Sequence, residues 1–202
     1  MKRLLVVLFA LSCIVVAQGM AEVVSVPLAQ PQGQWQVGAA LGYAPSQNGI
    51  DAMTGYGVMA RYGLNGAVDL YGEIGNSSMP AISMTSATLG LNWQFLSAGT
   101  SFADTALQVA VGKELSRSVG SASSATPVFV SLQAGMTNGG WYPFAGVGYN
   151  SADSVTNYAL DLGTRYTFAP DWLGRLEVNY NMNYSNSASN NYAISAEIAK
   201  VL

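Results

Sequence analysis

Three observations in this 202-residue sequence predict an all-β fold, a transmembrane antiparallel up-and-down β-barrel. Charged residues make up only 9% of the chain and hydrophobic residues 50%, whereas a typical soluble domain carries about 25% charged residues. From Gln34 onward, apolar and polar residues alternate with period two, which is the pattern of strands with two different faces. The one long apolar run lies at the start of the chain. Because backbone groups inside lipid must be paired, strands cross a membrane only as a closed barrel.

The start of the chain, residues 1–21, has the composition of a cleaved secretory signal peptide. Lys2 and Arg3 supply the positive charge, the apolar run LLVVLFALSCIVVA follows, and small residues permit cleavage after Ala17 or Ala21. The run is shorter than the roughly 20 apolar residues that a spanning helix needs, which favours cleavage over an anchor. The single cysteine, Cys13, then leaves with the signal, so we expect no disulfide and no Cys-based metal site.

A short segment containing proline and glutamine, residues 22–33, is expected to lie in the periplasm as a lead-in to a barrel at residues 34–202. Without Lys2 and Arg3, the 8 basic residues of the chain fall to 6 against 11 acidic ones, a net charge of about −5. An acidic balance argues against nucleic acid as a partner.

The period-two pattern divides the barrel region into ten candidate strands, an even number, as single-chain bacterial barrels require. In the first strand, Trp35, Val37 and Leu41 share one face and Gln36 takes the other. The weakest candidate carries Pro143 and several glycines, so a barrel of eight strands is the alternative. The strands are expected at Gln34–Tyr43, Tyr56–Gly63, Val68–Ile74, Ser86–Phe95, Leu107–Glu114, Val128–Met136, Ala145–Asn150, Tyr158–Phe168, Arg175–Tyr184 and Tyr192–Leu202.

Two kinds of connection alternate between these strands. One kind is rich in Ser, Asn, Ala and Gly, and the other is mostly shorter. Since the shorter turns of an outer-membrane barrel face the periplasm, both chain ends are expected on that side. The polar connections are expected at residues 45–54, 76–83, 116–126, 151–157 and 185–190, and the shorter ones at 64–66, 96–103, 137–140 and 169–173.

The placement of aromatic residues favours a membrane barrel over a soluble barrel with an apolar interior. Aromatic residues of the apolar face gather near strand ends, where amphipathic rings prefer the lipid headgroup level. Strand centres on this face carry Val, Leu and Ala, and the charged members Lys113 and Lys200 lie at strand ends, where lysine can snorkel. The expected girdle consists of Trp35, Tyr43, Tyr56, Tyr62, Trp93, Phe95, Tyr149, Tyr158, Tyr166, Phe168, Tyr184 and Tyr192.

Two segments carry a resemblance to a known group. The hairpin RYGLNGAVDLYGEIG, residues 61–75, and the last strand YAISAEIAKVL resemble those of the small bacterial outer-membrane β-barrel proteins, the group of the OmpA transmembrane domain and opacity-like proteins. The resemblance implies an integral outer-membrane location and recognition of residues 191–202 by the barrel-assembly machinery. The assembly signal of this group usually ends in Phe or Trp, whereas this chain ends in Leu202.

The sequence contains no histidine, which removes the usual general base and a common metal ligand. Asp69 and Glu73 could form a carboxylate pair, but a salt-bridge network with Arg61 is the favoured interpretation. Charges belong in a lumen rather than against lipid. The expected lumen charge network consists of Arg61, Asp69, Glu73, Glu114, Asp161, Arg165, Arg175, Glu177 and Glu197.

Turn chemistry extends this network to two hairpins. A three-residue loop, Leu64–Gly66, with Gly66 at positive φ, would place Arg61 directly opposite Asp69. In the hairpin around APDWLG, Arg165 would fall opposite Glu177.

The sequence therefore predicts a non-enzymatic outer-membrane barrel, either structural or a narrow porin-like channel with a charged lumen. The alternative is a surface adhesin that acts through its extracellular loops. No cofactor is expected, membrane lipid is the expected surrounding, and no feature identifies a specific protein or small-molecule partner.

Overall fold

A computed structural model describes residues 26–47, 51–118, 120–152, 155–183 and 190–202. The expected signal peptide and both cleavage positions lie outside these residues. Within the part of the chain that the structure describes, no helix is both long and apolar enough to cross a membrane. The strands are β1 (Trp35–Ala44), β2 (Met53–Gly63), β3 (Val68–Met79), β4 (Ile82–Leu96), β5 (Asp104–Ser118), β6 (Ser121–Ala125), β7 (Val128–Gly135), β8 (Trp141–Ala152), β9 (Val155–Ala169), β10 (Trp172–Asn183) and β11 (Asn191–Val201).

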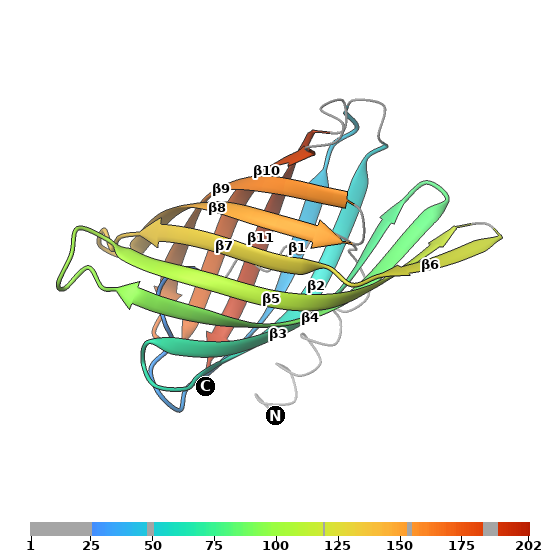
Figure 1. The fold of residues 1–202 in the computed structure, drawn as a ribbon. Helices are drawn as coiled ribbons and strands as arrows, with labels where there is room; N and C mark the ends of the chain where they lie inside the picture. The colour runs from blue at the N-terminus through green and yellow to red at the C-terminus, as the bar shows by residue number, and fades with distance from the viewer. Residues whose placement is uncertain (1–25, 48–50, 119, 153–154, 184–189) are drawn as a thin grey trace.

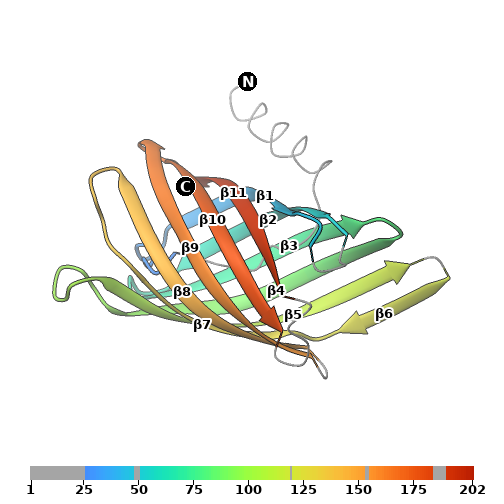
Figure 2. The same cartoon turned by 90° about the horizontal axis from the view of Figure 1, so that it is seen from above.

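These strands form one antiparallel sheet that closes on itself, because β1 pairs with both β2 and β11 (Figures 1 and 2). β6 and β7 occupy a single position in the barrel, since both pair with β5 in one continuous register. The ladder breaks between them at Pro127, which has no N–H to donate, although its carbonyl accepts a bond from Gly112 N at 2.8 Å. The ten-strand barrel predicted from the sequence is confirmed.

The two ends of the barrel differ in shape. We call the end where β1 begins and β11 ends the terminal end, and the opposite end the distal end. At the distal end, the expected loop 76–83 is mostly strand, because β3 and β4 leave only Pro80 and Ala81 between them. Most of the expected loop 116–126 likewise belongs to β5 and β6, which project beyond their neighbours (Figures 1 and 2). Backbone pairing continues here without apolar alternation, so the sequence pattern gave no sign of strand.

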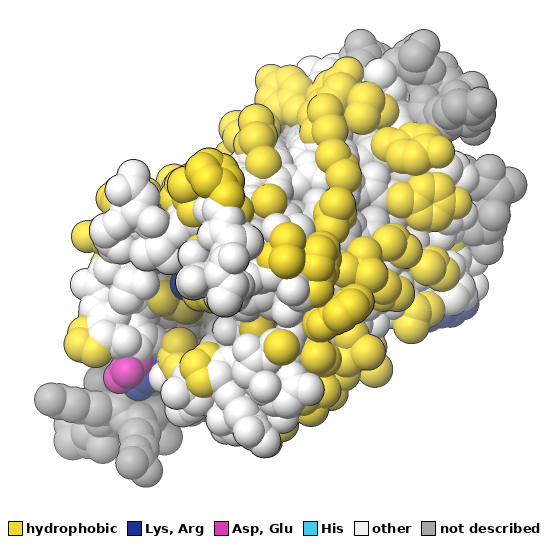
Figure 3. Space-filling view, turned by 60° about the vertical axis from the view of Figure 1, so that its left-hand side comes forward, with side chains coloured by type: hydrophobic (Ala, Val, Ile, Leu, Met, Phe, Trp, Pro, Cys, Tyr) yellow, Lys and Arg dark blue, Asp and Glu magenta, His cyan; other side chains and the backbone are white. Residues whose placement is uncertain are grey.

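The barrel turns its apolar face outward. Ile74, Leu89 and Val111 are 61%, 56% and 51% exposed, whereas Arg61 and Asp69 are 1% and 0% exposed. Hydrophobic side chains cover the outer surface in rows (Figure 3). Such an arrangement places apolar side chains where lipid would solvate them and encloses the charges. The expected assignment of faces is confirmed.

Exposed aromatic residues lie at both ends of the strands. At the terminal end, the rings of Trp35 and Tyr62 lie 4.8 Å apart, and at the distal end those of Tyr149 and Tyr158 lie 5.7 Å apart. Tyr184 of the expected girdle lies outside the described residues. Three further outward rings of the described strands, Trp141, Trp172 and Tyr180, were not expected in the girdle, and the ring centroids of Trp141 and Tyr166 lie 4.5 Å apart.

The register of the β2–β3 hairpin differs from the prediction by two residues. Arg61 lies opposite Tyr71 rather than Asp69. The loop is longer than three residues because the Asn65 side chain accepts bonds from the backbone of Ala67 and Val68, at 3.1 and 2.9 Å. Gly66 has φ +73°, as expected. A shift of two residues keeps every side chain on its face.

The β9–β10 hairpin contradicts the expected pairing of Arg165 with Glu177. Arg165 lies opposite Arg175, and Glu177 lies opposite Gly163. The ladder changes register at the turn, where Trp172 pairs with Ala169 but the next residue pairs with Thr167. This irregularity, which places two arginines opposite each other, has no signature in the alternating pattern.

Candidate functional site in the barrel lumen

The lumen is lined by buried polar side chains from most of the strands. At the terminal end, Arg61 on β2 and Asp69 on β3 form an ion pair, and Asp69 Oδ2 also accepts a bond from Arg61 Nε at 3.0 Å. Because their strands are offset, the two residues meet diagonally. Asn92 on β4 donates to the same carboxylate oxygen at 2.9 Å. This carboxylate is therefore held by donors from two neighbouring strands.

A segment that precedes β1 enters the lumen at this end. Val26 is 4% exposed and Gln30 is 5% exposed. The guanidinium of Arg61 donates to the carbonyl of Leu28 at 2.8 Å and more weakly to that of Val26 at 3.4 Å. The backbone N–H of Gln30 donates to Asp69 Oδ1 at 2.7 Å. The Arg61–Asp69 pair thus binds the chain itself, and we call residues 26–30 the inner segment.

Side chains of the barrel wall pack around the inner segment. Val26 and Leu28 form an apolar cluster with Tyr142 and Phe144 of β8. Ala29 N donates to Gln94 Oε1 at 2.7 Å. The segment expected as a periplasmic lead-in, residues 22–33, therefore has its described part largely within the barrel mouth.

Asp104, which the sequence analysis did not single out, organises the wall beside this segment. It is 3% exposed and accepts bonds from Gln94 Nε2 at 2.8 Å and from the Tyr142 hydroxyl at 3.0 Å. Tyr142 in turn lies under the guanidinium of Arg165, 5.2 Å from the ring centroid. Asp104 lies before the expected start of its strand, at residue 107, and for that reason pattern reading missed it.

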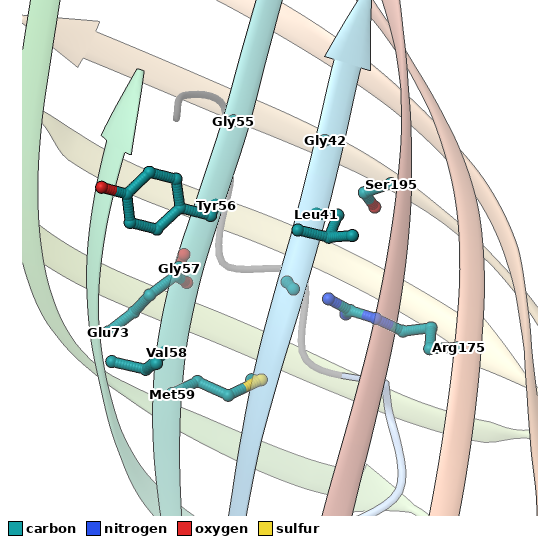
Figure 4. Close-up of a pocket in the computed structure, with 11 residues that line it drawn as sticks. Leu41, Gly42, Gly55, Tyr56, Gly57, Val58, Met59, Glu73, Arg175 and Ser195 are labelled. Atoms are coloured by element: carbon teal, nitrogen blue, oxygen red, sulfur yellow. The ribbon is translucent and has the colours of Figure 1, made fainter. Parts of the chain in front are cut away.

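The centre of the lumen holds one arginine among several carboxylates. Arg175 Nε lies 2.9 Å from Glu197 Oε2, and Arg175 Nη1 lies 3.5 Å from Glu177 Oε2. Glu73, on the opposite side of β1, points toward Arg175 (Figure 4). These four residues come from strands β3, β10 and β11, so the structure brings them together across the lumen.

Two further predicted carboxylates, Asp161 and Glu114, take part in none of the ion pairs of the described residues. Asp161 is 2% exposed and accepts a hydrogen bond from Asn179. Glu114 lies toward the distal end of β5 and is half-buried. In the described ranges, the ion pairs are those of Arg61 and Arg175, and no cluster of acidic residues has the composition of a metal site.

Amides and methionines complete the filling of the lumen. Gln108 and Gln133, 2% and 1% exposed, are joined by a hydrogen bond of 3.1 Å. Nearer the distal end, buried Met53 packs with Ala44 and Ala193, and two further methionines on β3 and β4 cover this cluster. The lumen is thus polar at its centre, occupied by chain at its terminal end and apolar toward its distal end.

Comparisons with known proteins found fold likenesses alone. No family model and no curated protein matches the sequence. Among solved structures, the chain is similar to the N-terminal β-barrel domain of Pseudomonas aeruginosa OprF, with 11% identity and a TM-score of 0.43, over 86% of this chain and 100% of that one. It is also similar to Neisserial surface protein A (NspA), with 14% identity and a TM-score of 0.42, over 83% and 95%. A third likeness is to the KdgM porin, with 10% identity and a TM-score of 0.46, over 82% and 98%.

The exterior of the barrel identifies its surroundings. A barrel that spans a lipid bilayer combines four features: a sheet without edges, an outward apolar belt, aromatic rings at both ends of that belt, and enclosed charges. This barrel has all four. The chain is an integral β-barrel of the bacterial outer-membrane type.

Proposed function

We propose that this protein is a non-enzymatic outer-membrane barrel with a closed lumen, whose role is structural. The inner segment carries this proposal, because Arg61 and Asp69 bind its backbone through Leu28 O and Gln30 N at 2.8 and 2.7 Å. These bonds occupy the groups that would otherwise face solute at the terminal end. The terminal end, where the turns predicted to be short lie, faces the periplasm in this proposal.

The filling of the lumen supports a structural role over an open channel. A barrel of about eight strands is just wide enough for side chains to fill it, and because the diameter grows roughly linearly with strand number, ten strands leave moderately more room. Here Gln108, Gln133 and the Arg175 cluster fill the centre, and the methionines fill the distal part. The absence of histidine from the sequence supports the non-enzymatic part of the proposal, because the common catalytic base is missing.

Single-channel recording in planar lipid bilayers tests this proposal. The wild-type chain should give no steady ion current above the bare bilayer. A variant that lacks residues 26–30 should give current only if the methionine cluster is opened as well, for example by Met53→Gly. Steady current from the wild type would overturn the closed lumen. Heat-modifiable mobility on gels verifies that each variant has folded.

The projecting hairpin of β5 and β6 favours a second candidate, a surface-interaction protein (Figure 1). Four of the five β6 residues are exposed, and they are small and uncharged. Bacteria that display the full chain should then adhere to host-cell layers or to one another. Replacing residues 116–124 with a two-residue turn should remove that adhesion and leave the amount of folded barrel unchanged. Adhesion that survives the replacement would contradict this candidate.

The last strand supports a proposal about assembly. β11 pairs with both β10 and β1 and so closes the barrel. We infer that the barrel-assembly machinery recognises residues 191–202. Leu202→Phe should then speed folding in cells, measured as the rate at which newly made chain becomes heat-modifiable, and an unchanged rate would count against recognition through the last residue.

A further inference from the structure

The outer wall of the barrel carries charge of one sign only. Every Asp and Glu of the described strands has inward register, whereas Lys113, Arg117 and Lys200 lie on the outward face. Outward strand faces with basic residues and no acidic ones are complementary to the phosphate groups of lipids, and the exposed Asp51 and Asp171 lie in connections between strands. The two lysines differ in their neighbours, because Lys200 lies over the ring of Trp172, 5.6 Å from its centroid, and Lys113 adjoins a groove.

The groove lies on the outside of β2 to β5 and has a volume of about 640 Å³. Small outward residues, Ala60, Gly72 and Ala87, form part of its floor, and the larger Ile74 and Leu89 stand exposed beside them. Its outward lining is apolar except for Lys113, so its chemistry suits an acyl chain.

Lys113 marks the upper edge of the apolar belt on this side. Its row across the sheet consists of Ala87, Ile74 and Val58. The next outward row toward the distal end already contains polar side chains, Asn76 and Thr85, which bond to each other at 3.1 Å. Lys113 therefore lies at the level of lipid headgroups. Its ammonium donates to Ser124 Oγ at 3.3 Å, and an ammonium has two further donors.

On the distal side of Lys113, the outward side chains are suited to bind the hydroxyl groups of a sugar. The rows beyond it carry mostly hydroxyl and amide side chains, with the exposed Leu115 between Lys113 and Arg117 on β5. Arg117 lies four residues farther along the strand than Lys113, about 13 Å away at the rise of a strand. A lipid with a single small headgroup would reach Lys113 alone. A phosphorylated glycolipid with a tall headgroup would contact Lys113, the hydroxyl-bearing rows and Arg117 together.

We propose that this wall is a binding site for a phosphorylated glycolipid of the outer leaflet, of the lipid A type. One acyl chain occupies the groove over Gly72, a phosphate binds Lys113, and the sugar lies against the polar rows below Arg117. The inference depends on the barrel lying in an outer membrane with its distal end outward, and it does not depend on whether the lumen is closed.

Native mass spectrometry of the folded, detergent-extracted chain tests the proposal, with diphosphorylated lipid A, phosphatidylglycerol and phosphatidylcholine as the added probes. Lys113→Gln should weaken lipid A binding about fivefold, the effect of one basic residue near a lipid surface. Lys200→Gln, the same change at the other end of the barrel, should leave lipid A binding as in the wild type.

A second pair of variants tests the groove. Gly72→Leu should fill it and weaken lipid A binding, and the fold should tolerate the change because a Cβ at Gly72 meets its nearest atoms at 3.7 and 3.8 Å. Ala145→Leu, on the outward face of β8 and away from the groove, is the control. Heat-modifiable mobility verifies folding of all four variants.

Three results would overturn the proposal. The first is lipid A binding that survives both Lys113→Gln and Gly72→Leu. The second is an equal loss on Lys200→Gln or Ala145→Leu, which would indicate a general effect of the surface. The third is phosphatidylglycerol binding as tight as lipid A binding with the same dependence on Lys113, which would assign the groove to a phospholipid. Failure of the closed-lumen proposal would appear as ion current, a separate measurement.

Discussion

Replacing Asp69 with alanine should destabilise the barrel more than any ordinary surface change. Asp69 is fully buried and accepts bonds from Arg61 Nε at 3.0 Å, Asn92 Nδ2 at 2.9 Å and Gln30 N at 2.7 Å, besides its ion pair with Arg61. Its removal leaves a buried cation without its carboxylate. Breaking a buried pair from one side typically costs about 3–5 kcal/mol. We expect a loss in this range in the free energy of unfolding.

The double variant Arg61→Met with Asp69→Ala separates the effect of the unpaired charge from the effect of the lost hydrogen bonds. It removes the unpaired cation but leaves the donors of Asn92 and Gln30 without their acceptor, which costs about 1–3 kcal/mol for each buried donor that finds no water. Because water can enter the space left by the two shortened side chains, we expect the double variant to lose about half as much as the single one.

Urea unfolding in lipid vesicles, followed by tryptophan fluorescence, measures these losses. Glu114→Ala is the matched control, because Glu114 is a half-buried strand carboxylate that takes part in none of the ion pairs of the described residues. It should change the unfolding free energy by about 0.5 kcal/mol or less. An Asp69→Ala loss below about 1 kcal/mol, or a double variant no more stable than the single one, would refute the reasoning.

Three further predictions concern the wall, the turns and the central cluster. Leu89→Arg, on the lipid face, should lower stability in vesicles by about 2–4 kcal/mol, and Thr88→Arg, on the inward face, should cost less. A loss in urea unfolding that is as large for Thr88→Arg as for Leu89→Arg would contradict the lipid-face argument. Ala81 has φ +68° in the turn after Pro80, so Ala81→Gly should raise the unfolding free energy by up to about 1 kcal/mol. Gly66→Ala, at φ +73°, should lower the unfolding free energy by about 1–2 kcal/mol. Calorimetric midpoints that move in the opposite directions would contradict this argument from backbone strain. Arg175→Met should lower the unfolding free energy by about 3–5 kcal/mol because it removes the cation that Glu177 and Glu197 bind. Adding Glu197→Gln to Arg175→Met should recover part of that loss in the same unfolding assay. No recovery would show that charge does not hold the cluster together.

The sequence was sufficient to predict which side chains of each strand point outward, but not which residues pair across neighbouring strands. The alternation of Trp35, Val37 and Leu41 with Gln36 determines which face meets lipid, because a side chain cannot change face without a shift of one residue. The offset of Arg61 from Asp69 depends on the Asn65 side chain, which replaces two ladder bonds in the turn. Such a replacement is a local choice between two hydrogen-bonding arrangements, and the hydrophobic pattern does not distinguish them.

For the candidate site, the sequence predicted only which charged residues lie in the lumen. An isolated ionised group is too costly to place against lipid, so Arg61, Asp69 and Arg175 had to lie inside. Neither the entry of the inner segment nor the part played by Asp104 follows from periodicity. The inner segment has no alternating pattern, and its burial depends on donors and acceptors from β2, β3 and β4 that meet only in the closed barrel.

The short link between the inner segment and the wall determines how such a closure would open. After Gln30 the chain turns at once, with Gln34 N bonded to Pro31 O at 3.1 Å and Gly33 N bonded to Gly63 O at 2.9 Å, and then enters β1. A released segment therefore remains tethered beside its own binding groups, at an effective concentration on the order of millimolar or more. Release would be followed by rapid rebinding without a diffusive search, so each exposure of Arg61 and Asp69 to solvent would be brief. A soluble peptide with the sequence VPLAQ would compete only at concentrations comparable to that of the tethered segment.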